Sequence, residues 1–571
     1  MKNVKNLFGM AVMATALVGC SSNDNLNPNP NDNAGKAGEA YAKFTIQLPT
    51  VSGTRADDPK PGTPLFEGGT ADEYAVKNAQ LVIFQKLNSG DPEGAYKFVE
   101  TVNIGNLEPW TNNTPNTGVT RYANITAQLN GVSLDETGNK YYALVILNNA
   151  GQSKVKLPES GTYSEWNKAG NAKSAADFLN SDNGFYMANA PLYSTGEPTT
   201  LVPINGVYST KAEAQNKPAT TVYVERGMAK VTIGSSTFDA DKPVTTSTNY
   251  AGDKVTITNW TLDVLNKTTF PVHVTTGLKT DFEAIWTTPR FVATGSTPQR
   301  VYWGVDPNYD KSTLTTVEAC QDEFYIVDNN GKTYNGDPSS TFTWSEKTTP
   351  LYCLENTFDL DNMKQGQTTR VVFKATYTPH NLTPGDKTFF MIGNNTQIWT
   401  KNALVAQITS KAKEMLNSTD VVVTVKDDAP LLKGGSHLLS SADVTIKDGS
   451  VDKTETFNYA TLNTKLGLDN TDGIKTYENG VCYYIARIKH FNELTPWKSG
   501  KVYGTDNVKY LGRYGVLRNN WYNLTVSKVS APGYPDVPVV KPETTDDEDT
   551  KYINVEVKIL DWAKRSQSVE L

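Results

Sequence analysis

Residues that could carry enzyme chemistry occur in this chain, but not in a recognised arrangement. Ser436 and His437 are adjacent. Neighbouring side chains on an extended strand point to opposite faces, so this pair predicts a local turn rather than a nucleophile and its base. The sequence has no GxSxG elbow, no GxxxxGK[ST] phosphate loop, no HExxH pair and no dinucleotide-binding glycine pattern. Carboxylate pairs for glycoside hydrolysis stay open, since any two of the 61 acidic residues could meet. We expect no enzyme and no catalytic residue.

Metal-binding and cofactor-binding patterns are also missing from the sequence. The cysteines show no CxxC spacing, and the 4 histidines are scattered. Residues 328–331 and 469–473 lack the EF-hand spacing and its terminal Glu, so they predict Asx turns. Cys320, Cys353 and Cys482 either include one disulfide or are three buried free thiols, the simpler interpretation. We expect no metal and no cofactor.

The N-terminus predicts export and lipid attachment. Two lysines precede an apolar run at residues 7–18, which is too short to span a bilayer and leads into LVGC at residues 17–20. LVGC resembles the bacterial lipoprotein box, in which the Cys is acylated and becomes the new N-terminus. An ordinary signal peptide is the alternative. We therefore expect a signal peptide at residues 1–19 and a precursor held on a membrane by acyl chains on Cys20.

Two segments near opposite ends of the chain have the alternation of a half-buried strand. Polar residues alternate with apolar ones in each segment, so one face is apolar and the other polar. Such a strand has to pair and pack against a sheet, in its own chain or in another. The apolar positions are Ala42, Phe44, Ile46 and Leu48 in the first segment, and Ile553, Val555, Val557 and Ile559 in the second.

Each of these strands has a neighbouring segment with the composition of a loop. Residues 530–550 are rich in proline and acidic residues, and they predict a solvated, semi-extended tether before the last strand. Arg55 and Ala56 lie in a stretch rich in Gly, Asp and Pro, where a trypsin-like protease can bind an extended backbone. A loop that is never cut is the other interpretation of Arg55.

The rest of the chain predicts a mostly β protein. The 28 tyrosines and 10 tryptophans favour strands, and the 42 glycines and 29 prolines favour turns. Helical spacing is confined to residues 174–179 and 400–416. Strands are predicted at residues 76–84, 141–147, 222–226, 255–264, 370–377, 420–425, 481–491 and 521–529.

A length of 571 residues exceeds what one hydrophobic core supports. Because no βαβ alternation is present, we expect two tandem β-sandwich, transthyretin-like domains with few short helices and a tethered C-terminal strand. The net charge of -7 gives no field that would attract nucleic acid, so no nucleic-acid partner is expected. The expected division is a propeptide at 20–55, domains at 56–238 and 239–529, a linker at 530–550 and a strand segment at 551–571.

Several short motifs occur in a fixed order: GTRAD at 53–57, VYVERGMAKVTI at 222–233, RVYWGVDPNYD at 300–310, YCLENTF at 352–358, CYYIARIKHF at 482–491, YGVLRNNWYNLTV at 514–526 and VEVKILDW at 555–562. Together with LVGC, they resemble the fimbrillins, the type V pilins of the Bacteroidales. The resemblance runs from residue 20 to residue 571 and is greatest to the major structural subunit of the short fimbriae.

This resemblance implies a route of assembly. The precursor reaches the outer membrane as a lipoprotein, an arginine-specific protease cuts between Arg55 and Ala56, and residues 20–55 leave with the first strand. The C-terminal strand of an identical or related subunit then fills the open groove, which is donor-strand exchange. The implied location is the fimbrium at the cell surface, with adhesion to host or bacterial surface receptors.

A function of another class also stays open. The chain could remain anchored through Cys20 as a fimbrial anchor or accessory subunit, or bind glycans by stacking sugars on Trp110, Trp166 and Trp497. Loop tryptophans also pin a loop to its own domain. The sequence does not decide between a shaft, accessory or tip position, the receptor, or where the C-terminal strand rests in the monomer.

Overall fold

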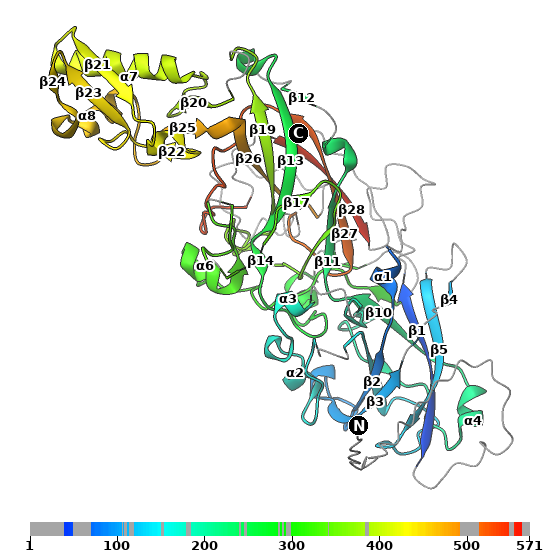
Figure 1. The fold of residues 1–571 in the computed structure, drawn as a ribbon. Coiled ribbons are helices and arrows are strands. Elements are labelled where there is room, and N and C mark those ends of the chain that lie inside the picture. The colour runs from blue at the N-terminus through cyan, green and yellow to red at the C-terminus, as the bar shows by residue number, and fades with distance from the viewer. Residues whose placement is uncertain are drawn as a thin grey trace, which may run out of the picture.

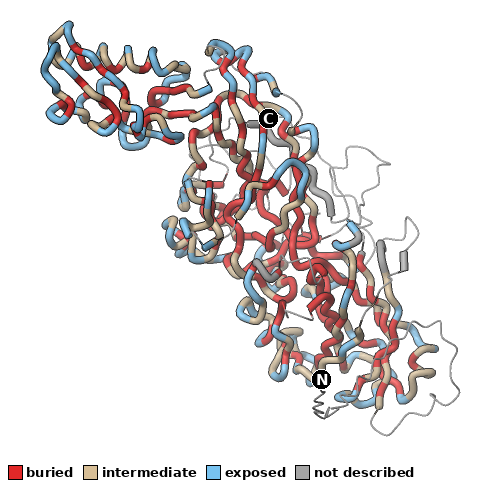
Figure 2. Tube along the Cα trace, in the orientation of Figure 1, coloured by how far each residue is buried: buried red, intermediate tan, exposed pale blue. Residues whose placement is uncertain are grey.

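The computed structural model describes residues 39–49, 70–105, 107, 111–112, 119–149, 154–178, 184–238, 241–244, 248–283, 286–287, 291–292, 298–329, 331–337, 339–340, 342–382, 387–490, 513–546 and 553–561. Within these residues the protein is mostly β, with few helices, most of them short, which confirms the predicted fold class (Figure 1). Buried residues run through the interior of both main bodies (Figure 2).

The first body is one bent sheet around an apolar core. Its nine described strands run in the order β3-β2-β6-β7-β10-β1-β5-β4, with β9 paired to β6. β10 forms the corner, because residues 220–223 pair with β1 and residues 224–226 pair with β7. The strands are β1 (Ala40–Pro49), β2 (Ala79–Gln85), β3 (Lys97–Gly105), β4 (Thr111–Asn112), β5 (Val119–Leu129), β6 (Tyr141–Leu147), β7 (Met187–Asn189), β9 (Val202–Pro203) and β10 (Thr220–Arg226).

The chain passes from the first sheet to the second at Gly227 and Met228. Gly227 is required here because a Cβ atom would lie 2.9 Å from the ring of buried Tyr186. β11 (Ala229–Ile233) follows at once and pairs with strands of the second body. The sequence placed the division later, between residues 238 and 239, because the turn-rich composition there is more conspicuous than a single glycine.

The second body is a β-sandwich. Within the described residues, one sheet has the order β18-β11-β27-β28 and the other β12-β13-β19-β26, with β17 on β13. Trp260, Phe373 and Tyr522 fill the core between the two sheets. The strands are β12 (Lys242–Pro243), β13 (Lys254–Asp263), β17 (Ser345–Glu346), β18 (Leu351–Cys353), β19 (Arg370–Thr378), β26 (Val481–Arg487), β27 (Asn520–Val529) and β28 (Ile553–Asp561).

A separate lobe is inserted between the adjacent strands β19 and β26, and it projects at the end of the molecule away from β1 (Figure 1). It has its own apolar core, in which Leu404 and Ile408 of the helix α7 are buried. Thr400 begins α7 by accepting a hydrogen bond from the backbone N–H of Ala403. The lobe contains β20 (Phe389–Ile392), α7 (Lys401–Leu416), β21 (Val421–Val425), β22 (Gly435–His437), β23 (Val444–Asp448), β24 (Val451–Asp452), α8 (Tyr459–Lys465) and β25 (Ile474–Tyr477).

The other helices in the described part of the chain are short connections at the surface and between the bodies. The predicted helical turn at residues 174–179 is found as α3. Two-residue strand pairs, β8 (Leu192–Tyr193) with β15 (Gln299–Arg300) and β14 (Leu265–Asn266) with β16 (Phe324–Tyr325), complete the framework. The helices are α1 (Ala71–Tyr74), α2 (Tyr163–Trp166), α3 (Ala175–Phe178), α4 (Lys211–Gln215), α5 (Leu278–Asp281) and α6 (Val317–Glu323).

Candidate strand-exchange site

β1 is a central strand of the first sheet. It runs antiparallel to β5, with Phe44 opposite Ile125, and parallel to β10, with Phe44 beside Thr220. Every apolar side chain of the alternation faces the core and is at most 3% exposed, which fits the period-2 pattern of the sequence. These side chains are Ala40, Ala42, Phe44, Ile46 and Leu48.

The polar face of β1 is also bound to its surroundings. Tyr41 and Tyr208 exchange backbone hydrogen bonds of 2.8 and 2.9 Å. Lys43 Nζ donates to the carbonyl of Gln215, the last residue of α4, at 3.0 Å. If β1 left the sheet, β5 and β10 would each expose an unpaired edge beside an open apolar core, which is a site for another strand.

The C-terminal strand β28 rests on the second body. It pairs antiparallel with β27, with Val557 opposite Leu524, and it is the last strand of its sheet. The pairing shifts between Val526 and Lys528, where β27 has one extra residue. In the monomer, the C-terminal strand is therefore folded back on its own subunit. The backbone of β28 is described, and its side chains lie outside the description.

The linker before β28 is docked onto the second body, so the predicted solvated tether is wrong for residues 530–546. Val537 and Val540 are buried at 1% and 2% exposure. Tyr534 exchanges two backbone hydrogen bonds of 2.8 Å with Tyr483, and Arg370 Nη2 donates to the carbonyl of Pro538 at 2.7 Å. The proline-rich and acidic composition of the linker predicted a solvated segment. Instead, apolar residues of the linker such as Val537 and Val540 are buried against the second body.

Glu73 anchors the chain that follows residues 50–69, which include Arg55. Its Oε1 atom lies 2.6 Å from Lys230 Nζ and accepts a 2.6 Å hydrogen bond from Tyr352 Oη. Burial raises the pKa of Glu73, but hydrogen bonds from Lys230 and Tyr352 outweigh it and hold the pKa below its ordinary value. Arg226 Nε donates to the Glu73 carbonyl at 2.8 Å. α1 is therefore fixed to the second sheet independently of β1.

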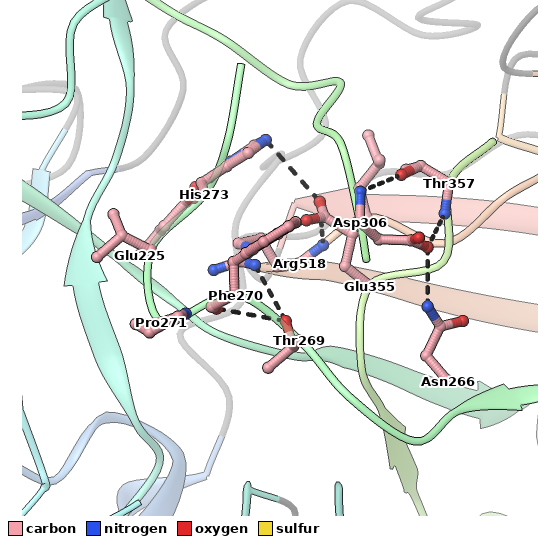
Figure 3. Close-up of polar contacts among 12 residues, drawn as sticks. Glu225, Asn266, Thr269, Phe270, Pro271, His273, Asp306, Glu355, Thr357 and Arg518 are labelled. Carbon is pink, nitrogen blue, oxygen red and sulfur yellow. Dashed lines mark hydrogen bonds and ion pairs between the residues drawn. The ribbon is translucent and has the colours of Figure 1, made fainter. Parts of the chain in front are cut away.

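A buried ion cluster joins the two bodies (Figure 3). Glu225 lies 2.8 Å from His273 Nδ1 and 2.6 Å from Arg300 Nη2. Glu355 lies 3.1 Å from Arg518 Nε and 3.9 Å from His273 Nε2. Burial raises the pKa of Glu225, but the charges of His273 and Arg300 prevail and leave it below its ordinary value.

Asp306 lies beside this cluster and is held by neutral donors (Figure 3). Its Oδ2 atom accepts hydrogen bonds from Asn266 Nδ2 at 2.8 Å and from the backbone N–H of Thr357 at 2.7 Å. Burial raises the pKa of Asp306 to about 7. The buried carboxylates of the junction are thus bound by neighbouring side chains and backbone groups, which gives them a structural role.

Several residues singled out by the sequence lie outside the described part of the chain. These are Cys20, Arg55, Ala56, Trp110 and Trp497. Trp166 is described and is 4% exposed, and its Nε1 donates to the carbonyl of Lys156 at 2.7 Å. The Trp166 ring therefore pins its own loop and offers no face for a sugar to stack on.

The remaining candidate residues have structural roles. Cys320, Cys353 and Cys482 are buried free thiols, so the disulfide alternative is excluded. Asp469 Oδ1 accepts backbone hydrogen bonds from Thr471 and Asp472, as predicted for an Asx turn. Asp328 closes a similar turn, and His437 contacts the Lys433 carbonyl. In the described ranges, no group of three His, Cys, Asp or Glu residues could hold a metal ion.

None of the helices described is both long and apolar enough to cross a bilayer.

Sequence reasoning missed the buried charges at the junction. Glu225, Arg226 and Lys230 all belong to the motif VYVERGMAKVTI and lie within or beside predicted strands. Three charges in an otherwise apolar strand pair were a signal, because an unpaired charge is rarely buried. Their partners are 45 or more residues distant in sequence, and only the fold brings them together.

Residues 475–568, which span β26, β27, the docked linker and β28, match the family described as major fimbrial subunit protein type IV, fimbrillin, C-terminal. The chain carries a fimbrillin C-terminal region. Over this part of the chain, the match agrees with the resemblance to the fimbrillins and supports a fimbrial protein. The description of the matching family names a fimbrial subunit.

Several solved structures are similar to this chain at low sequence identity. A candidate cell adhesion protein of Parabacteroides distasonis is 12% identical, with 92% of this chain and 98% of that chain covered and a TM-score of 0.38. The tip fimbrial protein Mfa3 of Porphyromonas gingivalis is 9% identical, with 92% and 100% covered and a TM-score of 0.28. A fimbrial assembly protein of P. distasonis is 13% identical, with 59% and 96% covered and a TM-score of 0.25. No curated protein matches the chain.

Proposed function

We propose that this fimbrillin is a structural subunit of surface fimbriae that is lipidated at Cys20, cut between Arg55 and Ala56, and polymerised by donor-strand exchange. The observation that carries the proposal is the position of β1: a central strand with a fully buried apolar face is joined to α1 by residues 50–69, which include Arg55. A cut there would free β1 without interrupting any other described strand.

The energetics favour a strand that stays in place until the cut. Burial of Phe44, Ile46 and Leu48 stabilises the sheet by about 5–9 kcal/mol, at 1.5–3 kcal/mol for each side chain. While β1 is covalently attached, it rebinds faster than a neighbour can enter. After the cut it dissociates as a separate peptide, and the groove between β5 and β10 becomes available.

β28 is suited to fill that groove. At rest it pairs on one side only, with β27, whereas a strand between β5 and β10 pairs on both sides. The move therefore adds a second ladder of backbone hydrogen bonds. Because each subunit has one groove and one donor, the contact is heterologous and propagates as an open fibre.

The docked linker limits how far the donor can reach. Asp546 is buried, and its backbone N–H donates to the carbonyl of Met363 at 3.1 Å. Six residues, 547–552, lie between it and Ile553, and they span at most about 20 Å when fully extended. The groove of the next subunit must therefore lie close to this edge of the donor. A well-formed donor strand favours a shaft position for this subunit, because a tip subunit needs no donor. The fibre as a whole would adhere to host or bacterial surface receptors.

The decisive experiment replaces the arginine. Arg55→Ala should leave a lipidated, uncut precursor in the outer membrane and no fibres, whereas Lys60→Ala, which removes a charge from the same stretch, should assemble normally. N-terminal sequencing of the wild-type fibre should begin at Ala56. An acylated Cys20 as the mature N-terminus would support the anchored lipoprotein instead. Fibres of normal length from Arg55→Ala would rule out the cut at Arg55.

A further inference from the structure

Glu225 is the contribution of the first sheet to the buried ion cluster. It lies at the C-terminal end of β10, before the chain crosses to the second sheet, whereas His273, Arg300, Glu355 and Arg518 all follow the crossing in sequence. Glu225 is 2% exposed, and both of its carboxylate oxygens contact a cationic or ionisable group at 2.8 Å or less. The first sheet thus places one negative charge against partners from later segments of the chain, of which Arg300 lies in β15.

The next residue of β10 is fixed on the other side of the strand. The backbone N–H and the Nη1 atom of Arg226 donate to Asn519 Oδ1 at 3.2 and 3.3 Å, and Nε donates to the carbonyl of Glu73. Side chains of successive strand residues point to opposite faces, so Glu225 and Arg226 hold the end of β10 from both faces. The end of the strand cannot rotate without breaking one of the two sets of contacts.

These contacts connect the two strands that matter for exchange. Tyr223, two residues before Glu225, pairs with Gln47 of β1, so β10 is one wall of the groove. Arg518 and Asn519 come directly before β27, the strand on which β28 rests. The cluster therefore joins the wall of the acceptor groove to the strand that carries the donor.

We propose that Glu225 is a positioning residue for assembly, which fixes the orientation of the acceptor groove relative to the donor strand. Bodies joined within one chain move relative to each other unless their interface prevents it. Withdrawal of Glu225 would leave His273 and Arg300 without their carboxylate in a buried site, which opposes any change of the angle between the bodies. This role rests on the proposed strand exchange and adds that successive subunits stack at a constant angle, which gives a stiff fibre.

The first test measures the angle in the uncut monomer, which requires neither cutting nor polymerisation. Spin labels are placed at Ser89→Cys in the first body and Thr348→Cys in the second, both at exposed positions, in the full chain with Cys20→Ser. The three other thiols are buried and do not compete for the label. The distance distribution should be narrow in the parent chain and roughly twice as wide with Glu225→Gln, because the interface no longer holds the bodies.

Asp263→Asn is the matched control. Asp263 is equally buried and pairs with Arg370 at 2.8 Å, but both residues belong to the second body. This variant should lower stability and leave the distance distribution narrow. If Glu225→Gln does not fold, Arg300→Gln removes one partner of Glu225 and should give an intermediate width. An unchanged width in Glu225→Gln or Arg300→Gln, or equal broadening in Asp263→Asn, overturns the role of Glu225.

The second test follows the assembled fibre by electron microscopy. Cut subunits with Glu225→Gln should polymerise into more strongly bent fibres than the parent, and Asp263→Asn fibres should stay straight. If the parent itself does not polymerise after the cut, the proposed function fails while the monomer distances still report on Glu225. If Glu225→Gln broadens the monomer distance distribution but its fibres stay straight, Glu225 holds the two bodies together and has no role in assembly.

Discussion

The ammonium of Lys230 lies 2.6 Å from Glu73 Oε1 and 3.8 Å from the centroid of the Trp521 ring. Lys230 and Glu73 are 4% and 1% exposed, so this ion pair is formed almost without water. It ties α1, which follows residues 50–69, to β11 and β27 of the second body. The N-terminal part of a cut subunit therefore keeps an attachment that does not depend on β1.

Glu73→Gln should lower the free energy of unfolding by about 3–5 kcal/mol at pH 7, because it leaves the buried Lys230 without its carboxylate. The folded-state pKa of Glu73 lies below the ordinary value of 4.5. The pair therefore contributes its stability above that value and loses it as the pH falls through the folded-state pKa. Urea denaturation at pH 6 and pH 3 should show a smaller pH effect in Glu73→Gln than in the parent. Equal pH effects in the two proteins would contradict this assignment.

Phe44→Ala should lower the stability of the precursor and leave the stability of the fibre unchanged. In the precursor Phe44 is fully buried, so truncation should cost about 3–5 kcal/mol. The proposed fibre lacks β1, so the melting temperature of assembled subunits should equal that of the parent. Phe373→Ala, at an equally buried position of β19, should lower both temperatures. A destabilised Phe44→Ala fibre would mean that β1 remains in the polymer.

Deletion of residues 552–571 should give a folded monomer that does not polymerise after the cut. β28 is an edge strand, so its loss opens only one side of β27. Gel filtration and electron microscopy after proteolysis should show monomers alone. Polymers of normal length from the shortened chain would rule out β28 as the donor.

Val540→Asp should detach the linker. Val540 is 2% exposed and packs in the cluster with Cys320, so a carboxylate there would be buried without a partner. The neighbouring Val539 is 60% exposed, and Val539→Asp is the control that adds the same charge to the surface. Limited proteolysis within residues 530–546 should be faster in Val540→Asp alone. Equal cleavage rates in the two variants would show that the linker is held by other contacts.

The sequence predicts strands well wherever alternation or an apolar run is local. The strand at 141–147 is found with the same bounds, and those at 222–226 and 521–529 begin within two residues of the observed β10 and β27. The alternation of Ala42 to Leu48 also predicts which face of β1 is buried.

Features that depend on distant partners could not be predicted. Val537 packs with Val372, more than 160 residues earlier, so local composition alone suggested a free tether. The pairing of Glu225 with His273 likewise exists only after both bodies have folded. The separate lobe was missed because its strands and helix have ordinary patterns, and nothing local marks them as an insertion.

The lobe between β19 and β26 has one more consequence. It leaves and re-enters the sandwich on neighbouring strands, and its first and last strands, β20 and β25, pair with each other. Its two ends are therefore side by side, and its core is its own. Such an insertion can be replaced as a unit. A short hairpin or a foreign domain with adjacent termini could take its place while β1, β10 and β27 keep their neighbours. Repeated along a polymer, the same position would display any inserted sequence once per subunit.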